Sequence, residues 1–386
     1  MLDGRPTQPG YRAHLGRGIG HYTQKLIEYL PALGSKDTFL ILQDANRDFN
    51  VRSCRENLRS LGYRAAGWIP AKYEILRNQM VLPWVLRSAK ADLVHFFCHE
   101  DAPLLSPVDM IVTIHDLVAQ ALPQLYKPKE NLAWKFKMEL VRKIAHQAKY
   151  IITSSESSKK DVVCYLGVSE HKIEVIYAGV ESSFCPVFDP QQLNEVRERY
   201  NIPEEFLLYL GGIDPRKNIF NLLEAFRALL LCGYRHLSLV IAGAIEHQIE
   251  YPQLLRWLKE LELEHKVRLI GFVSQQDLPA LFSLARVFLF PSLYEGFGLP
   301  PLEAMACGTP LVTSSNSSLA EVVGDAGVYV DPHSPEDIAG GIKILLSQPE
   351  LRKSLQQKGI KRAKLFSWEK TAQKILRAYH EFEKNH

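Results

Sequence analysis

Two glutamates in one short string are the residues best suited to chemistry. Glu295 and Glu303 lie eight positions apart in the string PSLYEGFGLPPLE. Carboxylates accept hydrogen bonds from hydroxyl groups, and Gly296 and Gly298 allow a backbone to approach a ligand closely. The string predicts a turn after a strand and then a helix from about Leu299, whose first N–H groups suit a phosphate or a sugar hydroxyl. An isolated pair at this spacing also fits a surface cap, but the whole string favours a ligand site.

Two adjacent bases, Arg216 and Lys217, form the second candidate group, within the string LGGIDPRKN. We expect them to open a helix near Asn218, directly after a strand. Two cations together with the N–H groups of a helix start suit a pyrophosphate. Adjacent bases are often only solvated, but the preceding glycines and proline favour an anion site. The sequence has no Asp-x-Asp pair, which predicts a site that neutralises phosphate without a metal ion.

A glycine-rich string, LGRGIGHY, precedes the first predicted helix and contains Gly18. A dinucleotide-binding oxidoreductase uses such a string only after a complete strand. Here only Met1 and Leu2 precede Asp3, so we expect most of a first strand to be missing or to form differently. His115 ends another predicted strand, and parallel sheets bind ligands beyond the carboxyl ends of their strands. A structural histidine bonded to backbone is the alternative.

The elements that position these residues alternate between short apolar strands and amphipathic helices. Nearly continuous apolar strands with helices between them indicate parallel sheets covered on both faces. The alternation restarts after Asn201, which predicts two doubly wound units, with a linker near Val180–Tyr200. Strands are expected at 39–42, 93–97, 110–114, 150–153, 173–177, 206–210, 237–242, 267–270, 287–290, 310–313 and 328–330.

Composition limits the class of protein. The 386 residues include 46 Lys and Arg against 43 Asp and Glu, a net charge of +3 that is too weak to suggest nucleic-acid binding. The six cysteines form no Cys-x-x-Cys pair, which predicts reduced thiols and a cytoplasmic protein. No apolar run reaches about 18 residues, and we expect no signal peptide.

Two further segments have alternative interpretations. His95, Cys98 and His99 have zinc-ligand types, but without a second ligand cluster the rim of an acceptor site is favoured. The basic amphipathic segment Lys127–Lys143 is expected to be a solvated helix that packs Leu132, Phe136 and Leu140 inward. The alternative is contact with anionic lipid headgroups.

These motifs together resemble the retaining glycosyltransferase family 4 (group 1), which has the two-domain GT-B fold. The Glu-x7-Glu string carries the resemblance, and the other motifs agree in order along nearly the whole chain. The resemblance implies that Glu295 contacts the hydroxyls of the donor sugar and that Glu303 holds the ribose. It also implies that backbone at Gly296, Phe297, Gly298 and Leu299 completes the sugar site.

The resemblance assigns further donor contacts. Arg216 and Lys217 would contact the diphosphate; some members carry an additional arginine where this chain has Gly212. Gly18 would approach the donor phosphates, and His115 would position the sugar or stabilise the transition state. The turn with Phe272 and Val273 resembles the strand end whose backbone receives the nucleobase. Ile241–Gly243 would line the same pocket.

The resemblance implies two domains, 1–182 on the acceptor side and 183–366 on the donor side, with a C-terminal helix at 367–386 packing on the first. The implied function is retaining, metal-independent transfer of a hexose, with mannose favoured, from a GDP- or UDP-linked sugar. The acceptor is a saccharide or lipid-linked saccharide. No cofactor and no nucleic-acid partner are expected. Peripheral contact with the inner face of the membrane is expected. A non-catalytic nucleotide-sugar-binding subunit and a dinucleotide-binding oxidoreductase are the alternatives.

Overall fold

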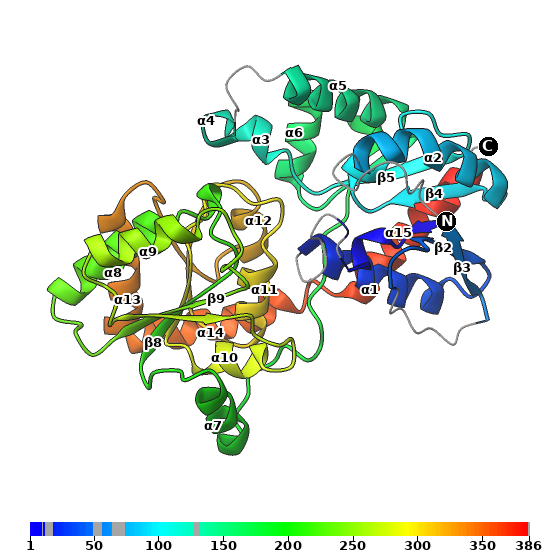
Figure 1. Cartoon of the computed structure of the whole chain (residues 1–386). Helices are drawn as coiled ribbons and strands as arrows, with labels where there is room; N and C mark the ends of the chain where they lie inside the picture. Colours follow the sequence, from blue (N-terminus) through cyan, green and yellow to red (C-terminus); the bar gives the residue numbers. More distant parts are fainter. Residues whose placement is uncertain (10, 12–17, 49–55, 64–73, 127–131, 385–386) are drawn as a thin grey trace. The chain divides into compact units, whose positions relative to one another are not determined.

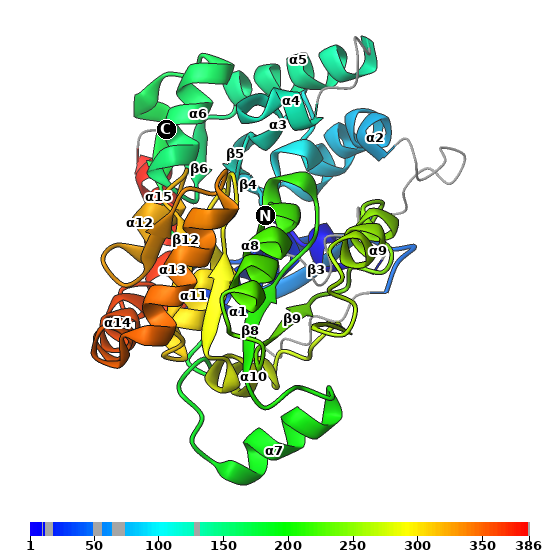
Figure 2. The same ribbon diagram turned by 90° about the vertical axis from the view of Figure 1, so that its left-hand side faces the viewer.

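The chain forms two compact units, seen in a computed structural model that describes residues 1–9, 11, 18–48, 56–63, 74–126 and 132–384. The first unit comprises Met1–Gln120, Tyr126–Gly179 and Ser367–His386. The second comprises Ala121–Leu125 and Val180–Phe366 (Figure 1 and Figure 2). Each unit contains one parallel sheet, so the predicted architecture of two Rossmann-like units is confirmed.

The first sheet has the strand order β3-β2-β1-β4-β5-β6-β7. All of its pairings are parallel. Its strands are β1 (Leu2–Asp3), β2 (Phe39–Asp44), β3 (Leu58–Tyr63), β4 (Leu93–Phe96), β5 (Asp109–Ile114), β6 (Tyr150–Thr153) and β7 (Ile173–Val175).

The first strand is very short, as the sequence predicted. β1 is two residues long, yet it lies between β2 and β4, because Leu2 pairs with both Ile41 and His95. The fully buried Arg5 follows it and forms an ion pair with Asp3 at 2.7 Å. This buried pair anchors the loop after β1, so a strand too short to show a sequence pattern is held in place by its neighbours.

The first sheet is covered by helices of the first unit, including the last helix of the chain. They are α1 (Gly18–Leu33), α2 (Glu74–Ala89), α5 (Leu132–Gln147), α6 (Glu156–Leu166) and α15 (Trp368–Lys384). Two short helices, α3 (Val118–Ala121) and α4 (Pro123–Tyr126), lie where the chain passes between units, since Ala121–Leu125 belongs to the second. α15 packs against α1. The Tyr379 hydroxyl of α15 contacts Nδ1 of His95 at 2.5 Å, so the end of the chain is fixed to the core of the first unit.

The inward packing expected for the basic helix is wrong for two of its three apolar residues. Leu140 is buried, but Leu132 and Phe136 of α5 are 80% and 70% exposed. The part of the segment at 127–131 lies outside the described residues. α5 therefore presents large apolar side chains to solvent.

The second sheet has the order β10-β9-β8-β11-β12-β13, and its pairings are also parallel. Its strands are β8 (Phe206–Leu210), β9 (Ser238–Ala242), β10 (Val267–Gly271), β11 (Val287–Phe290), β12 (Leu311–Ser314) and β13 (Val328–Val330). The order reverses direction between β8 and β11, which is where doubly wound sheets bind ligands at their carboxyl edge.

Helices lie on both faces of this sheet (Figure 1). α8 packs with α9 and α13 in one layer, while α11 packs with α10 and α14 in another. The helices are α7 (Pro190–Arg199), α8 (Ile219–Leu231), α9 (Tyr251–Glu260), α10 (Leu278–Leu284), α11 (Leu299–Ala306), α12 (Leu319–Val323), α13 (Pro335–Ser347) and α14 (Pro349–Ala363).

The segment predicted as a linker contains a helix of the second unit. α7 packs against α10, and Arg199 at its end donates to both carboxylate oxygens of Asp277 at 2.8 Å. The charged run Glu195–Arg199 is therefore the C-terminal end of an ordinary surface helix. In the described part of the chain, no helix is both long enough and apolar enough to cross a membrane.

Candidate active site

The Glu-x7-Glu string forms the loop after β11 and the start of α11, at the carboxyl edge of the second sheet. Gly298 caps the helix with a φ of 116°, a conformation open to glycine but strained for other residues. A Cβ at this position would also lie 3.0 Å from the Leu319 side chain. The turn therefore requires glycine here, as the string predicted, and it places both glutamates beside the edge of the sheet.

The two bases lie before α8 rather than in its first turn. Pro215–Lys217 form a single 3-10 turn, η5, and Asn218 follows in the left-handed conformation with a φ of 61°. The Asn218 amide donates to the carbonyls of Pro291 and Pro332 at 3.0 and 2.6 Å. The expectation that the bases open the helix is thus corrected: a separate turn, tied to the neighbouring strand ends by Asn218, carries them.

Glu295 forms ion pairs with both bases. One carboxylate oxygen accepts from Arg216 Nη1 and the other from Lys217 Nζ, each at 2.6 Å. Arg216 also pairs with Asp214 at 3.2 Å, so two carboxylates balance the two cations. Lys217 lies 4.8 Å from the centre of the Phe290 ring. The structure therefore brings two adjacent predicted site residues together with a third that lies 78 positions beyond Lys217.

Burial disfavours the charged forms of both Glu295 and Lys217, so it moves their pKa values in opposite directions. Burial raises the pKa of Glu295, but Arg216 and Lys217 outweigh it and hold that pKa at about 2. Burial and the adjacent Arg216 lower the pKa of Lys217, against the opposing influence of Glu295. Glu295 is therefore ionised at neutral pH, and it occupies the positive groups that an entering anion would need.

Glu303 has the opposite electrostatic setting. Its side chain is 92% buried in α11, and no described residue forms a hydrogen bond or ion pair with its carboxyl group. Burial, with a smaller contribution from Glu181, raises the pKa of Glu303 to about 8. A buried carboxyl group without a protein partner is costly, so this residue is a strong candidate for binding a ligand hydroxyl.

The helix start next to Glu303 offers few amide donors. Pro300 and Pro301 have no N–H group, and the Leu302 N–H donates to the Gly298 carbonyl at 3.2 Å. The N–H groups of Gly298 and Leu299 have no acceptor within the helix. Gly296 and Phe297, also predicted to line the sugar site, lie buried in the same turn.

Strand ends β8, β9 and β10 meet beside this loop. The Gly211 N–H donates to the Ala242 carbonyl at 3.0 Å, and the Gly243 N–H donates to the Gly271 carbonyl at 2.8 Å. A Cβ on Gly243 would lie 2.4 Å from the Gly211 carbonyl oxygen. Of the residues predicted to receive the base, Val273 is buried and Phe272 is 65% exposed. Gly212 lies half-buried at the same edge.

Two predicted site residues belong to the first unit. His115 follows β5, and its Nε2 donates to the Phe97 carbonyl at 2.9 Å. Its ring packs edge-on against Tyr22 with the centroids 4.8 Å apart. Gly18 is the exposed first residue of α1, and a Cβ there would meet no atom within 4 Å. The part of its motif at 15–17 lies outside the described residues.

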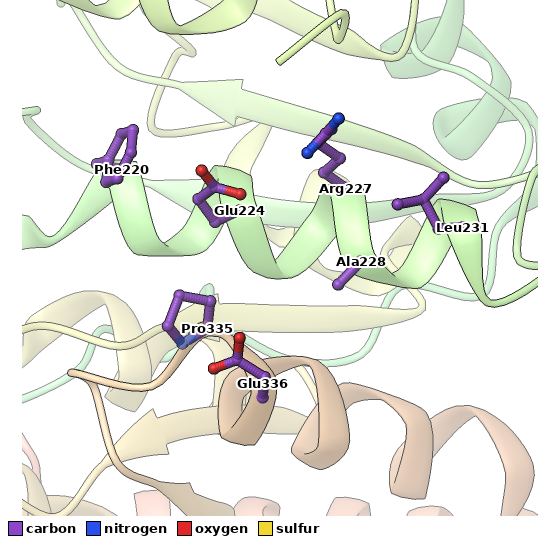
Figure 3. A pocket seen from close by; sticks show the side chains of 7 residues that line it. All are labelled: Phe220, Glu224, Arg227, Ala228, Leu231, Pro335 and Glu336. Carbon is purple, nitrogen blue, oxygen red and sulfur yellow. The ribbon is translucent and has the colours of Figure 1, made fainter. Parts of the chain in front are cut away.

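Two other features are candidates for a functional site: the strand end with His95, Cys98 and His99, and a hollow on α8. Both ring nitrogens of His95 are engaged, by Tyr379 and by the Thr113 hydroxyl, and the described residues contain no group of three His, Cys, Asp or Glu that could hold a metal. A hollow of about 380 Å³ (Figure 3) contains none of the motif residues. Its lining consists of Phe220, Glu224, Arg227, Ala228, Leu231, Pro335 and Glu336.

Sequence reasoning did not identify Asp214, Ser317 or Ser318 as parts of the site. The Ser317 hydroxyl accepts from the Glu295 N–H at 2.8 Å, and the Ser318 hydroxyl contacts the Glu295 carbonyl at 2.8 Å. The signal was present as a run of small polar residues, TSSNSS, directly after a predicted strand. Its meaning depended on knowing that the β11 and β12 loops are neighbours.

The sheets and the site define a class of protein. A sucrose-phosphate synthase from Thermosynechococcus elongatus has the same fold, with a TM-score of 0.80 at 22% identity, covering 100% of this chain and 99% of that chain. That fold is GT-B, with two Rossmann-like domains, and it is typical of glycosyltransferases.

Sequence comparisons identify the family. Residues 193–362 match the model of "Glycosyl transferases group 1" and residues 16–184 that of "Glycosyltransferase Family 4". O-antigen chain mannosyltransferase B of Escherichia coli is 33% identical over 270 residues, 70% of this chain and 69% of that protein. Serotype-specific mannosyltransferase WbdA of Escherichia coli is 29% identical over 277 residues, 71% of this chain but a third (33%) of WbdA. The chain belongs to glycosyltransferase family 4, group 1, and the predicted resemblance is confirmed.

Proposed function

We propose that this glycosyltransferase transfers a mannosyl group from a nucleoside diphosphate mannose to a hydroxyl of a saccharide or lipid-linked saccharide, with retention and without a metal ion. The observation that carries the proposal is the pairing of Glu295 with Arg216 and Lys217, together with the buried carboxyl of Glu303, which no described residue pairs with. The names of the relatives favour mannose. A cytoplasmic location remains a prediction.

The site residues divide the donor among them. Arg216 and Lys217 bind the diphosphate, Glu303 accepts hydrogen bonds from the ribose hydroxyls, and Glu295 turns to the sugar hydroxyls. Two preorganised cations stabilise the charge that develops on the departing phosphate, and a donor of this kind is worth roughly 2.7–4 kcal/mol in other enzymes. The nucleobase lies against the β10 turn, where the exposed ring of Phe272 provides a stacking surface.

The transfer step needs no protein nucleophile. The bond between the sugar C1 and the β-phosphate oxygen breaks while the acceptor oxygen bonds to C1 on the same face. The acceptor proton passes to the departing phosphate oxygen, so the charges balance. By the family resemblance, we assign His115 to the donor sugar and Gly18 to the donor phosphates.

Calorimetry with GDP-mannose, UDP-glucose and their free nucleotides tests the donor assignment, and release of nucleotide with a saccharide acceptor tests the transfer. We expect GDP-mannose to bind and activity to survive EDTA. Failure of every nucleotide sugar to bind would contradict the proposal, and activity lost in EDTA but restored by Mg²⁺ would overturn metal independence. Binding without nucleotide release would favour the non-catalytic alternative, and NAD(P)H binding the oxidoreductase.

A peripheral contact with anionic membranes is part of the proposal. α5 exposes Leu132 and Phe136 next to the exposed Lys135, a combination typical of helices that lie on a lipid surface. Sedimentation with vesicles that contain phosphatidylglycerol should capture the protein, and substitution of both Leu132 and Phe136 by serine should reduce capture. Equal capture of the double variant would remove α5 from the contact.

A further inference from the structure

A ladder of hydroxyl and amide side chains joins two loops of the second unit. The end of β12 and the loop after it provide the side chains of this ladder, and each bonds to backbone of the segment 290–297 that carries Glu295. Thr313 and Ser314 belong to the strand, and Asn316, Ser317 and Ser318 belong to the loop. Side chains that bond to a neighbouring backbone fix its path without filling the site. The loop of Glu295 is thus held along its whole length from one side.

Glu295 is held at both of its backbone polar groups. Its N–H donates to the Ser317 hydroxyl at 2.8 Å. Its carbonyl oxygen lies 2.8 Å from the Ser318 hydroxyl oxygen. The Phe297 carbonyl oxygen lies 2.7 Å from that same Ser318 hydroxyl. Ser318 has a single hydroxyl proton, so it serves one of these two carbonyls at a time.

Ser317 reaches this position only in a strained backbone conformation. Its φ is 52°, in the left-handed region that serine rarely adopts. Strain of this kind persists where the surrounding structure requires it, and it clusters at functional sites. Here the left-handed turn directs the hydroxyl to the Glu295 N–H, while the next residue, Ser318, lies fully buried.

We propose that Ser317 is a positioning residue that sets the direction of the Glu295 carboxylate toward the donor sugar, with Ser318 as its partner. The inference rests on the proposed function, because it needs a sugar at Glu295. Arg216 and Lys217 bind the diphosphate whether or not a sugar is attached, whereas the Glu295 carboxylate contacts the donor only when a sugar is present. Ser317→Gly keeps this carboxylate and both of the bases that pair with it. Loss of the Ser317 hydroxyl should therefore weaken recognition of the sugar and leave recognition of the nucleotide unchanged.

The decisive variant is Ser317→Gly. Glycine adopts the left-handed conformation without strain, so the melting temperature should stay within about 3 °C of the wild type or rise. The dissociation constant of GDP should change less than twofold. That of GDP-mannose should rise about tenfold, the upper end of the net contribution of one hydrogen bond, and GDP release from GDP-mannose should slow.

Two further variants separate positioning from folding. Glu262→Gly relieves a similar left-handed residue, with a φ of 57°, at an exposed position after α9; it should leave both dissociation constants unchanged. In a Glu295→Gln background, Ser317→Gly should add less than a twofold effect, because the hydroxyl acts through Glu295.

The outcomes distinguish the two claims. If the wild type binds no nucleotide sugar, the proposed function and this inference both fail. Otherwise the test uses whichever of GDP-mannose and UDP-glucose the wild type binds. If Ser317→Gly shows the same ratio of donor affinity to free-nucleotide affinity as the wild type, only the inference is overturned. Equal weakening of GDP and GDP-mannose would also overturn it.

Discussion

Glu303 gives the sharpest test, because its charge depends on pH in a range where the protein can be studied. Burial raises its pKa from 4.5 in an unfolded chain to about 8 in the folded protein. The native state therefore holds a proton that the unfolded state has lost between these values. The stabilising effect of that proton is complete below about pH 4.5 and is lost as pH rises toward 8 and beyond.

The size of the effect follows from the shift. The difference between 4.5 and about 8 corresponds to about 5 kcal/mol at 1.36 kcal/mol per pH unit. Glutamine resembles the neutral acid in shape and cannot ionise. Glu303→Gln should therefore match the wild type in unfolding free energy near pH 5 within about 1 kcal/mol, and should exceed it by several kcal/mol near pH 9.

Denaturant unfolding at pH 5, 7 and 9 measures this difference. The exposed Glu260→Gln is a matched control that removes a glutamate from the surface of the same unit, and its difference from the wild type should not grow with pH. A constant difference between Glu303→Gln and the wild type from pH 5 to pH 9 would refute the assignment of a raised pKa.

Donor binding gives a second measurement on the same residue. Ribose hydroxyls donate to a carboxylate, so binding should expel the proton from Glu303 and release about one proton at pH 6.5. Calorimetry of GDP-mannose binding in buffers of different ionisation enthalpy counts this proton. Glu303→Gln should release none and should bind at least about tenfold more weakly, since hydrogen bonds to a charged group contribute about 1.5–3 kcal/mol. Unchanged affinity would contradict the ribose role.

Three other predictions concern the remaining groups of the site. Lys217→Ala should lower kcat at least about 10²-fold, and a change under threefold would remove Lys217 from the mechanism. Glu295→Gln should bind GDP several-fold more tightly than the wild type while it releases GDP from GDP-mannose more slowly, because it removes the anion that pairs with both bases at 2.6 Å; weaker GDP binding in calorimetry would contradict this. Gly243→Ala should lower the melting temperature by several degrees, since its Cβ would lie 2.4 Å from the Gly211 carbonyl oxygen, and an unchanged unfolding curve would show that the backbone after β8 and β9 relaxes.

The sequence located four strands residue for residue. β6, β8, β11 and β13 begin and end as predicted, because their apolar runs are bounded by turn residues. β3 was missed since its side chains are mostly exposed or half-buried at the edge of the sheet, where burial imposes no apolar pattern. β1 was not among the expected strands because two residues cannot show a period.

The sequence also placed Glu295, Glu303, Arg216 and Lys217 at strand ends, since glycine-rich turns after apolar runs mark those positions. It could not show that Glu295 pairs with both bases, because strands β8 and β11 become neighbours only when the sheet forms. The exposure of Leu132 and Phe136 was equally hidden, since a helical stripe shows which residues share a face but not whether another element covers it.

Local chemistry and tertiary structure thus determined different properties of this protein. The amino-acid sequence by itself determined the alternation of strands and helices, the turns that need glycine and the types of groups available for a donor, because these depend on neighbours within a few residues. Only the tertiary structure decided that one glutamate is held ionised by two cations and the other is protonated by burial. Charge state depends on distance and solvent exposure, and both are set by residues that are remote along the chain.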